Sequence, residues 1–345
     1  MSTLRTVVSR LLSPGTRRAA IWAEVGVMER FRGGPLGGLV HPLLVRRYRR
    51  RPEEIDIEVT SSCDADCIMC PRRSMRRAQG PMALPLFEAI VDEAVTLGVR
   101  DLVLNGYGEI ATLRNYRDYL AYIRRRSATI RILVNTNGMR LTEDFAAALI
   151  EYGVDVVNIA IDGATAETYE SIRRYLKLDV VEANVRRFID MRNASGKKRP
   201  YIMVNMIHMP ENAHEAEAFL AKWQGIPDYA GLAGVVSRGG SIDVPKRGGD
   251  WASTPCFLLW RQMPILSDGT VAMCCDDWDG TSDLGNVASG GIKAIWQSPA
   301  HERFRELHLA GRAAELELCR GCQSPRQPPW WFRKDAPTDA ASNGA

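Results

Sequence analysis

The sequence lacks any long uncharged apolar run, and nothing in it approaches the roughly 20 residues that a membrane-spanning helix needs. It also lacks a secretory leader, because Arg5 and Arg10 interrupt the apolar start and no small-residue cleavage site follows. These absences exclude a transmembrane segment and predict a cytoplasmic protein. Of the 345 residues, 46% are hydrophobic and 25% are charged, so most of the chain can fold around a core.

Acidic residues are scarce near the N-terminus. Residues 1–51 hold eleven arginines against Glu24 and Glu29, a net charge of +9, whereas the remainder carries −5. The pattern predicts a basic helical extension with a solvated face; attraction to an anionic substrate, a membrane surface or a partner is the alternative. Nucleic acid is not expected as a partner, because the basic stretch lacks interleaved aromatic residues.

Strand and helix patterns alternate from Glu54 to about residue 240. Predicted strands lie at 55–59, 101–105, 130–134, 156–161, 201–208 and 232–237, and the helices between them include one that opens at Asn212 with Glu215 in a capping box. This alternation predicts parallel βαβ units in an α/β fold, about six of them, and so a partial (β/α)6 barrel. The predicted domains are an extension at 1–51, the barrel at 52–240, a cysteine-rich domain at 241–330 and a disordered tail at 331–345.

Three cysteines follow the first predicted strand, and no histidine or fourth cysteine lies near them. They are Cys63, Cys67 and Cys70. In a chain with no secretory leader, clustered cysteines indicate metal or redox chemistry rather than disulfides. Three thiolates cannot complete a four-ligand site, so one metal position stays open for substrate-level chemistry. Zinc is the weaker alternative, because it would need a fourth local ligand.

This segment resembles the cluster-binding motif of the radical S-adenosylmethionine (SAM) superfamily. Further segments resemble that family in order: Asn105–Ile110, Asn135–Gly138, and Ile159–Gly163 followed by Tyr169 and Arg173. The resemblance implies a [4Fe–4S] cluster on the three cysteines, SAM on its open iron, and an external electron donor such as flavodoxin or ferredoxin. It also implies cofactor contacts from a set of residues at the strand ends: Met69, Gly106, Gly108, Glu109, Asn137 and Asp162.

A second cysteine group lies nearly two hundred residues later: Cys256, Cys274, Cys275, Cys319 and Cys322. Residues 269–275 are predicted to form a turn and a strand, on which the adjacent Cys274 and Cys275 would point to opposite faces. Four thiolates would close a site, either structural zinc or a fully ligated [4Fe–4S] cluster. The five histidines show no metal-binding spacing and are expected to be solvated or hydrogen-bonded.

Residues 255–323 resemble the C-terminal SPASM/twitch extension of radical SAM enzymes. The resemblance implies one auxiliary [4Fe–4S] cluster on Cys256, Cys274, Cys319 and Cys322. Cys275 is then not among the four ligands. We expect it to be a buried small residue; the alternatives are a hydrogen-atom donor or an alternate ligand. Some twitch-type members act on aminocyclitols, and others act on nucleoside-linked sugars. We therefore expect a radical SAM enzyme that acts on a small sugar-like molecule. Radical modification of a ribosomal peptide and a non-enzymatic zinc-binding α/β protein are the alternatives.

Overall fold

The computed structural model describes residues 48–234, 256 and 258–322. The chain divides into two compact units, Arg50–Arg326 and a second that combines Met1–Arg49 with Gln327–Ala345. The fold below is that of Arg50–Arg326. The predicted basic extension (apart from its last four residues), the interdomain segment at 241–254 and the predicted tail lie outside the described residues.

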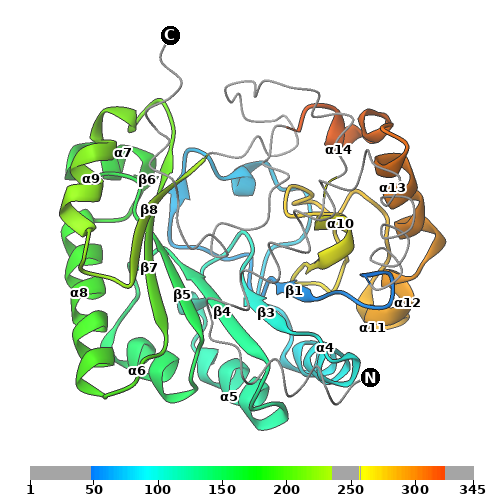
Figure 1. The fold of residues 1–345 in the computed structure, drawn as a ribbon, viewed down its shortest axis with the longest axis horizontal. Helices are drawn as coiled ribbons and strands as arrows, with labels where there is room; N and C mark the ends of the chain where they lie inside the picture. Colours follow the sequence, from blue (N-terminus) through cyan, green and yellow to red (C-terminus); the bar gives the residue numbers. More distant parts are fainter. Residues whose placement is uncertain (1–47, 235–255, 257, 323–345) are drawn as a thin grey trace, which may run out of the picture. The chain divides into compact units, whose positions relative to one another are not determined.

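A single parallel sheet of seven strands organises this unit (Figure 1), in the order β8-β7-β5-β4-β3-β1-β9. The strands are β1 (Glu54–Ile57), β3 (Asp101–Leu104), β4 (Arg131–Thr136), β5 (Val156–Ala160), β7 (Tyr201–His208), β8 (Tyr229–Gly234) and β9 (Gln262–Ile265). A second, two-stranded antiparallel sheet pairs β2 (Asp66–Cys67) with β6 (Arg173–Arg174). The predicted α/β class and the six strands of a partial barrel are confirmed.

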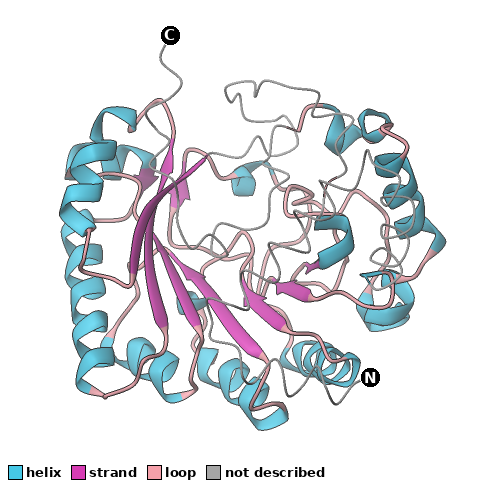
Figure 2. Cartoon of the chain, in the orientation of Figure 1, coloured by secondary structure: helices cyan, strands magenta, loops and turns pink. Residues whose placement is uncertain are grey.

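Helices connect the strands and lie along one side of the sheet (Figure 2). They are α4 (Leu84–Leu97), α5 (Tyr116–Arg126), α6 (Glu143–Glu151), α7 (Ala166–Ile172), α8 (Leu178–Ala194) and α9 (Ala216–Trp223). Short 3-10 turns precede two of them, η2 (Ile110–Thr112) before α5 and η3 (Ala213–Glu215) before α9. None of the described helices is long and apolar enough to cross a membrane.

The two faces of the sheet differ in chemistry, because alternate residues of a strand point to opposite sides. One face carries apolar side chains that are at most 1% exposed, among them Ile55, Leu102, Ile132, Val157 and Ile202. This is the face that a layer of helices would bury. The other face is mixed: it carries buried apolar residues, Val103, Leu133 and Met203, and a set of polar ones, Asp56, Asn105, Asn135, Asn158 and Asn205. This inner face therefore offers hydrogen-bonding groups that the helix-covered face lacks.

The seventh strand comes from the cysteine-rich part of the chain and was not expected in this sheet. Strand β9 pairs in parallel with β1, with Glu54 opposite Gln262 and Ile57 opposite Ile265. Without it, β1 would be an edge strand with unpaired backbone groups. The C-terminal part continues with α10 (Leu258–Arg261), α11 (Val287–Gly290), α12 (Ile292–Trp296), α13 (Pro299–Leu309), η5 (Ala313–Glu315) and α14 (Glu317–Arg320).

Two local predictions were wrong. Glu215 does not cap its own helix: its carboxylate accepts from the backbone N–H groups of Ala164 and Thr165, at 2.5 and 3.1 Å, and so caps the start of α7. Residues 274–275 lie in a turn rather than on a strand, and strand-like pairing is limited to bridges at Thr270 and Val271. The opposite-face argument for Cys274 and Cys275 therefore loses its basis.

Candidate active site

The first three cysteines lie in the loop that follows β1, as predicted. Cys63 is in the loop itself, Cys67 ends β2, and Cys70 precedes the 3-10 turn η1 (Pro71–Ser74). The backbone N–H of Cys70 donates to the carbonyl of Cys67 at 3.0 Å, which tightens the loop. All three side chains are half-buried. The loop is therefore held by backbone hydrogen bonds within itself and to other segments, such as that from the Ile68 N–H to the Ile172 carbonyl, and its sulfurs stay partly accessible.

The sulfur atoms of this loop favour a positively charged partner. Burial raises the pKa of the Cys63 thiol to about 12 and also raises the pKa of Cys67. The Ala65 N–H donates to Cys63 Sγ at 3.4 Å, and the Arg173 guanidinium lies 3.9 Å from Cys67 Sγ and opposes part of the Cys67 shift. Buried thiolates need counter-charge, which iron supplies. The donor set fits a cluster bound by three thiolates.

Glu109 joins the ends of two strands beside this loop. Its carboxylate accepts from Thr136 Oγ1 at 2.9 Å, from the Asn137 N–H at 2.7 Å and from the Ala111 N–H at 3.1 Å. Its own N–H donates to the carbonyl of Ser62 at 2.8 Å. Burial raises the pKa of Glu109 to about 7, although the three donors oppose the shift. A nearby cation, such as an ammonium group, would favour its ionised form.

Asn137 links the third strand segment to the cysteine loop. Its Nδ2 donates to Asp64 Oδ1 at 2.7 Å and lies 3.9 Å from Cys63 Sγ. Arg140 pairs with the same Asp64 carboxylate at 2.9 Å. Asp64 was not singled out in the sequence, because an isolated acid in a loop carries no signal. In the structure, Asp64 connects the cysteine loop to the Asn135–Gly138 segment through its hydrogen bond with Asn137.

Asp162 is fully buried, and both oxygens of its carboxylate interact with groups of the protein. Its carboxylate pairs with Arg173 at 2.7 Å and accepts from the Ile207 N–H at 2.7 Å. The Arg173 side chain also reaches Cys67, so Asp162 positions the Arg173 guanidinium next to the cysteine loop. A direct contact between Asp162 and the cofactor stays a prediction.

Met69, Gly106 and Gly108 lie beside the same loop. Met69 is buried against Ile172 and Met209, so in this structure it packs in a small apolar cluster. A Cβ at Gly106 would lie 2.5 Å from Glu58 Cγ, and one at Gly108 would lie 2.1 Å from the carbonyl oxygen of Thr60. Both glycines therefore allow a close approach of two loops. Their contacts with a cofactor stay predictions.

Glu58 and Arg77 connect the barrel to the second cysteine group. The Arg77 guanidinium bonds both Glu58 oxygens at 2.7 Å, and both side chains are buried. Arg77 also donates to the carbonyl of Trp278 at 2.6 Å, and the Tyr107 hydroxyl donates to the carbonyl of Cys275. The motif residue Tyr107 is thereby bonded to the turn that carries Cys274 and Cys275.

The predicted auxiliary ligands lie in one neighbourhood. Asp276 bridges two of them: its N–H donates to Cys274 Sγ at 3.4 Å, and its carboxylate lies 3.9 Å from Cys322 Sγ. Cys256 is close enough to Cys274 to raise its pKa, although burial is the main cause of that shift. Cys275 is half-buried, not fully buried as expected. The structure thus brings together residues that are up to 66 positions apart.

His308 belongs to this group and was missed in the sequence. It is 1% exposed, its Nδ1 accepts from the backbone N–H of Cys256 at 3.2 Å, and its Nε2 lies 3.4 Å from Cys319 Sγ. Because Nδ1 accepts, the neutral ring carries its proton on Nε2 and donates it to the sulfur. No spacing rule could have found this residue, since it reaches two cysteines from a different helix.

A single metal ion and a cluster make different demands on these side chains. Across the described residues, no three histidine, cysteine, aspartate or glutamate side chains meet as a single ion would require. The thiolates of an iron–sulfur cluster each bind a different corner, so they need not converge on one point.

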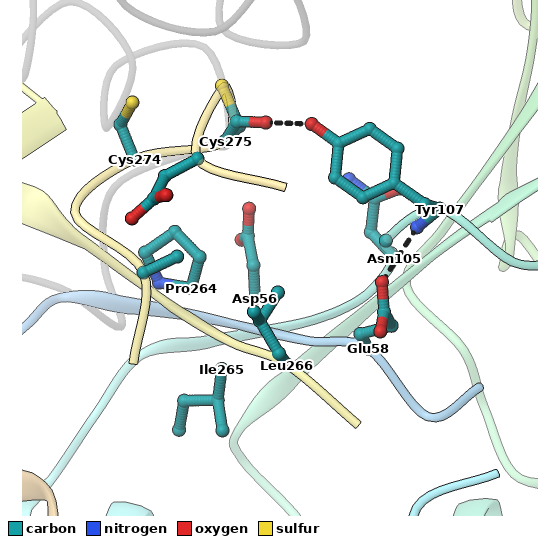
Figure 3. A pocket seen from close by; sticks show the side chains of 12 residues that line it. Asp56, Glu58, Asn105, Tyr107, Pro264, Ile265, Leu266, Cys274 and Cys275 are labelled. Carbon is teal, nitrogen blue, oxygen red and sulfur yellow. Dashed lines mark hydrogen bonds between the residues drawn. The ribbon is translucent and has the colours of Figure 1, made fainter. Parts of the chain in front are cut away.

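A cavity lies between strand β1 and the turn of the second cysteine group (Figure 3). Asp56 on strand β1, Glu58 just after that strand, and the segment Asn105–Tyr107 after β3 line one side of it. The C-terminal part contributes its remaining lining residues: Pro264, Ile265, Leu266, Ala272, Cys274, Cys275 and Asp277. The cavity therefore adjoins both the glycine-rich segment and the turn of the second cysteine group.

Two family models match the chain. The radical SAM superfamily matches residues 57–222, and SPASM, an iron–sulfur cluster-binding domain, matches residues 256–323. The resemblances drawn from the cysteine spacing are confirmed. The two domains imply [4Fe–4S] clusters and SAM as cofactors, and solved structures of similar fold hold bound AdoMet.

Two curated relatives show different degrees of likeness. The S-adenosyl-L-methionine-dependent 2-deoxy-scyllo-inosamine dehydrogenase of Niallia circulans is 20% identical over 273 residues, which are 78% of this chain and 92% of that protein. The GTP 3',8-cyclase of Ectopseudomonas mendocina is 33% identical over 158 residues, which are 45% of this chain and 46% of that protein. The chain thus spans about half the length of the cyclase it matches.

Two solved structures share the fold. One is BtrN in complex with AdoMet and 2-DOIA, with a TM-score of 0.58, 19% identity, and coverage of 79% of this chain and 94% of that one. The other is SuiB of Streptococcus suis bound to the precursor peptide SuiA, with a TM-score of 0.60, 13% identity, and coverage of 82% and 77%. At these identities the likeness concerns the fold alone.

Proposed function

Since this chain is a radical SAM protein with a SPASM iron–sulfur domain, we propose that it abstracts hydrogen from a small sugar-like substrate in natural-product biosynthesis. The substrate class is an aminocyclitol, an aminoglycoside or a nucleoside-linked sugar. The net outcome is dehydrogenation, decarboxylation or dehydration. When bound, the clusters and SAM supply a carbon-centred radical and a route for one electron.

The chain's own residues hold and orient these groups. Cys63, Cys67 and Cys70 would bind the cluster whose open iron takes SAM. The Gly106–Glu109 segment would face the amino group of SAM, as the family resemblance implies. Cys256, Cys274, Cys319 and Cys322 would bind the auxiliary cluster. The domain limits predicted from the sequence, 52–240 and 241–330, remain part of this proposal.

A row of amide side chains on the inner face of the barrel is the observation that supports a hydroxyl-rich substrate. Asn158 Nδ2 donates to Asn135 Oδ1 at 2.9 Å, and Asn205 Nδ2 donates to Asn158 Oδ1 at 2.6 Å. The three amides form a ladder across β4, β5 and β7. Ladder amides have donors and acceptors left for hydroxyl groups, which an apolar barrel interior would not offer. The likeness in sequence to an inosamine dehydrogenase supports the same substrate class.

Peptide modification is the second candidate, and the shared fold with peptide-bound SuiB favours it. A ribosomal peptide would need an extended docking surface, and residues 1–47, which precede the barrel and could contribute to one, lie outside the described part of the chain. The preference for a small molecule is therefore argued from the inner face of the barrel and not from that segment. An external donor such as flavodoxin or ferredoxin is the proposed source of electrons.

The test is anaerobic reconstitution followed by assay of 5′-deoxyadenosine. We expect about eight irons per chain, from two four-iron clusters, and reductive cleavage of SAM. Replacing Cys63, Cys67 and Cys70 by alanine should leave about four irons and abolish cleavage. A colourless protein that holds only zinc would show the proposed chemistry to be wrong. Label transfer into 5′-deoxyadenosine from deuterated sugars, but not from peptides, would decide between the candidates.

A further inference from the structure

Asp56 differs from the other acidic residues around the cavity in having an unused oxygen. The residue lies on β1 and is 8% exposed, and its Oδ2 accepts from Gln262 Nε2. Its Oδ1 has no hydrogen-bond partner among the described residues. Figure 3 shows the side chain rising from β1 into the space between Tyr107 and Cys274. A buried carboxylate oxygen with no donor is costly unless a ligand completes it.

The other carboxylates of the cavity lining have hydrogen-bond partners for their oxygens, and Glu58 is paired with Arg77 at 2.7 Å. Glu54 does not line the cavity; its Oε2 is paired with Arg261 at 3.1 Å, and its Oε1 has no hydrogen-bond partner among the described residues. Asp277 accepts from backbone and hydroxyl donors of Thr281 and Ser282. Within the described residues, no ion pair is formed by Asp56 itself. Asp277 forms no ion pair among the described residues either, so the feature that distinguishes Asp56 among the lining carboxylates is its unused oxygen.

We propose that Asp56 binds a protonated amino group of the substrate, so that the substrate is an amine-bearing sugar or cyclitol rather than a neutral polyol. The inference rests on the proposed function and narrows its substrate class. An ammonium group supplies both the missing hydrogen-bond donor and the missing positive charge. Burial raises the pKa of Asp56, with the nearby Glu54 carboxylate as a smaller cause, and a bound cation would reverse that effect.

The position of Asp56 suits a residue that sets substrate orientation. The cavity adjoins Gly106 and Tyr107 of the proposed SAM segment on one side and the Cys274–Cys275 turn on the other. An amine held at Asp56 would place the rest of a small ring beside both the proposed SAM segment and the Cys274–Cys275 turn. Asn105, which lines the same cavity, offers an amide to the ring hydroxyls.

The experiment measures binding to the anaerobically reconstituted, SAM-loaded protein by calorimetry. The probes are scyllo-inosamine and glucosamine, each with its N-acetyl derivative and with the counterpart in which a hydroxyl replaces the amine. We expect at least one amine to bind about tenfold or more tightly than both of its counterparts. Asp56→Asn should remove that preference, while the surface variant Asp190→Asn on α8, which makes the same chemical change, should keep it.

Three results would overturn the inference. They are equal binding of an amine and its neutral counterparts, binding of none of the amines, and a loss of SAM affinity in Asp56→Asn without any change for amines. The last result would mean that the cavity receives the amino group of SAM itself. If Asp56→Asn fails to fold, the amine preference of the unmodified protein still decides. Production of 5′-deoxyadenosine with a neutral polyol would refute the amine inference yet keep the proposed function, whereas no cleavage of SAM with any substrate would refute the function.

Discussion

Gly108→Ala should damage the active site through space alone. A Cβ at Gly108 would lie 2.1 Å from the carbonyl oxygen of Thr60 and 2.7 Å from that of Ser62. Both atoms belong to the backbone that leads into Cys63, so no side chain can rotate away. Ordinary contacts of this kind need about 3.4 Å, so one loop must move by roughly 1 Å. The hydrogen bond from the Glu109 N–H to the Ser62 carbonyl, 2.8 Å long, lies in the same place and would be stretched.

The free energy of unfolding should fall by about 3 kcal/mol, from overpacking with part of a hydrogen bond added. For a domain of this size that corresponds to a melting temperature lower by about 6–12 °C. The affinity for SAM should fall as well, because the displaced loop carries Cys63. The measurements are thermal unfolding and SAM binding under anaerobic conditions.

Gly290→Ala is the matched control for this substitution. Gly290 is exposed, and its added Cβ would meet only the flexible side chain of Ile295, at 3.2 Å. We expect its melting temperature and SAM affinity to stay close to those of the unmodified protein. If Gly108→Ala behaved in the same way as Gly290→Ala, the inferred close approach of the two loops would be wrong.

Three further predictions concern single side chains. Burial raises the pKa of Glu109 from 4.5 to about 7, so the free energy of unfolding of the SAM-free protein should fall as the pH rises through that window. Measured by urea unfolding, the stability of Glu109→Gln relative to the unmodified protein should therefore increase by up to ~3 kcal/mol between pH 4.5 and 7.5. A stability difference that does not change with pH would contradict this. His308→Phe removes the Nε2–H group, whose nitrogen lies 3.4 Å from Cys319 Sγ. The midpoint potential of the auxiliary cluster should then fall by tens of mV in an EPR titration. An unchanged potential would show that the contact is not a hydrogen bond to the sulfur. Cys275→Ser should keep the full iron content, and a loss of about four irons would make Cys275 a ligand.

Short-range patterns carried most of the information on the fold. The strand predicted at 55–59 and the strand predicted at 130–134 were both located to within a few residues. Prediction failed where a side chain acts at long range, as Glu215 does on α7. Capping rules describe neighbours along the chain, and the competing donors of Ala164 and Thr165 are 50 or 51 positions away. The seventh strand escaped prediction for the same reason.

The spacing of the first three cysteines and the motifs that follow them along the chain were enough to indicate the radical SAM superfamily, which its family model confirms. Such motifs can be read from the sequence because each is a short run of neighbouring residues. The tertiary structure alone decided which charges are compensated. Arg77 pairs with Glu58 and Arg261 pairs with Glu54, whereas Asp56 forms no ion pair within the described residues and keeps one oxygen without a hydrogen-bond partner there. That difference depends on how β9 and the second cysteine group pack against β1, and packing of segments two hundred residues apart leaves no trace in local spacing.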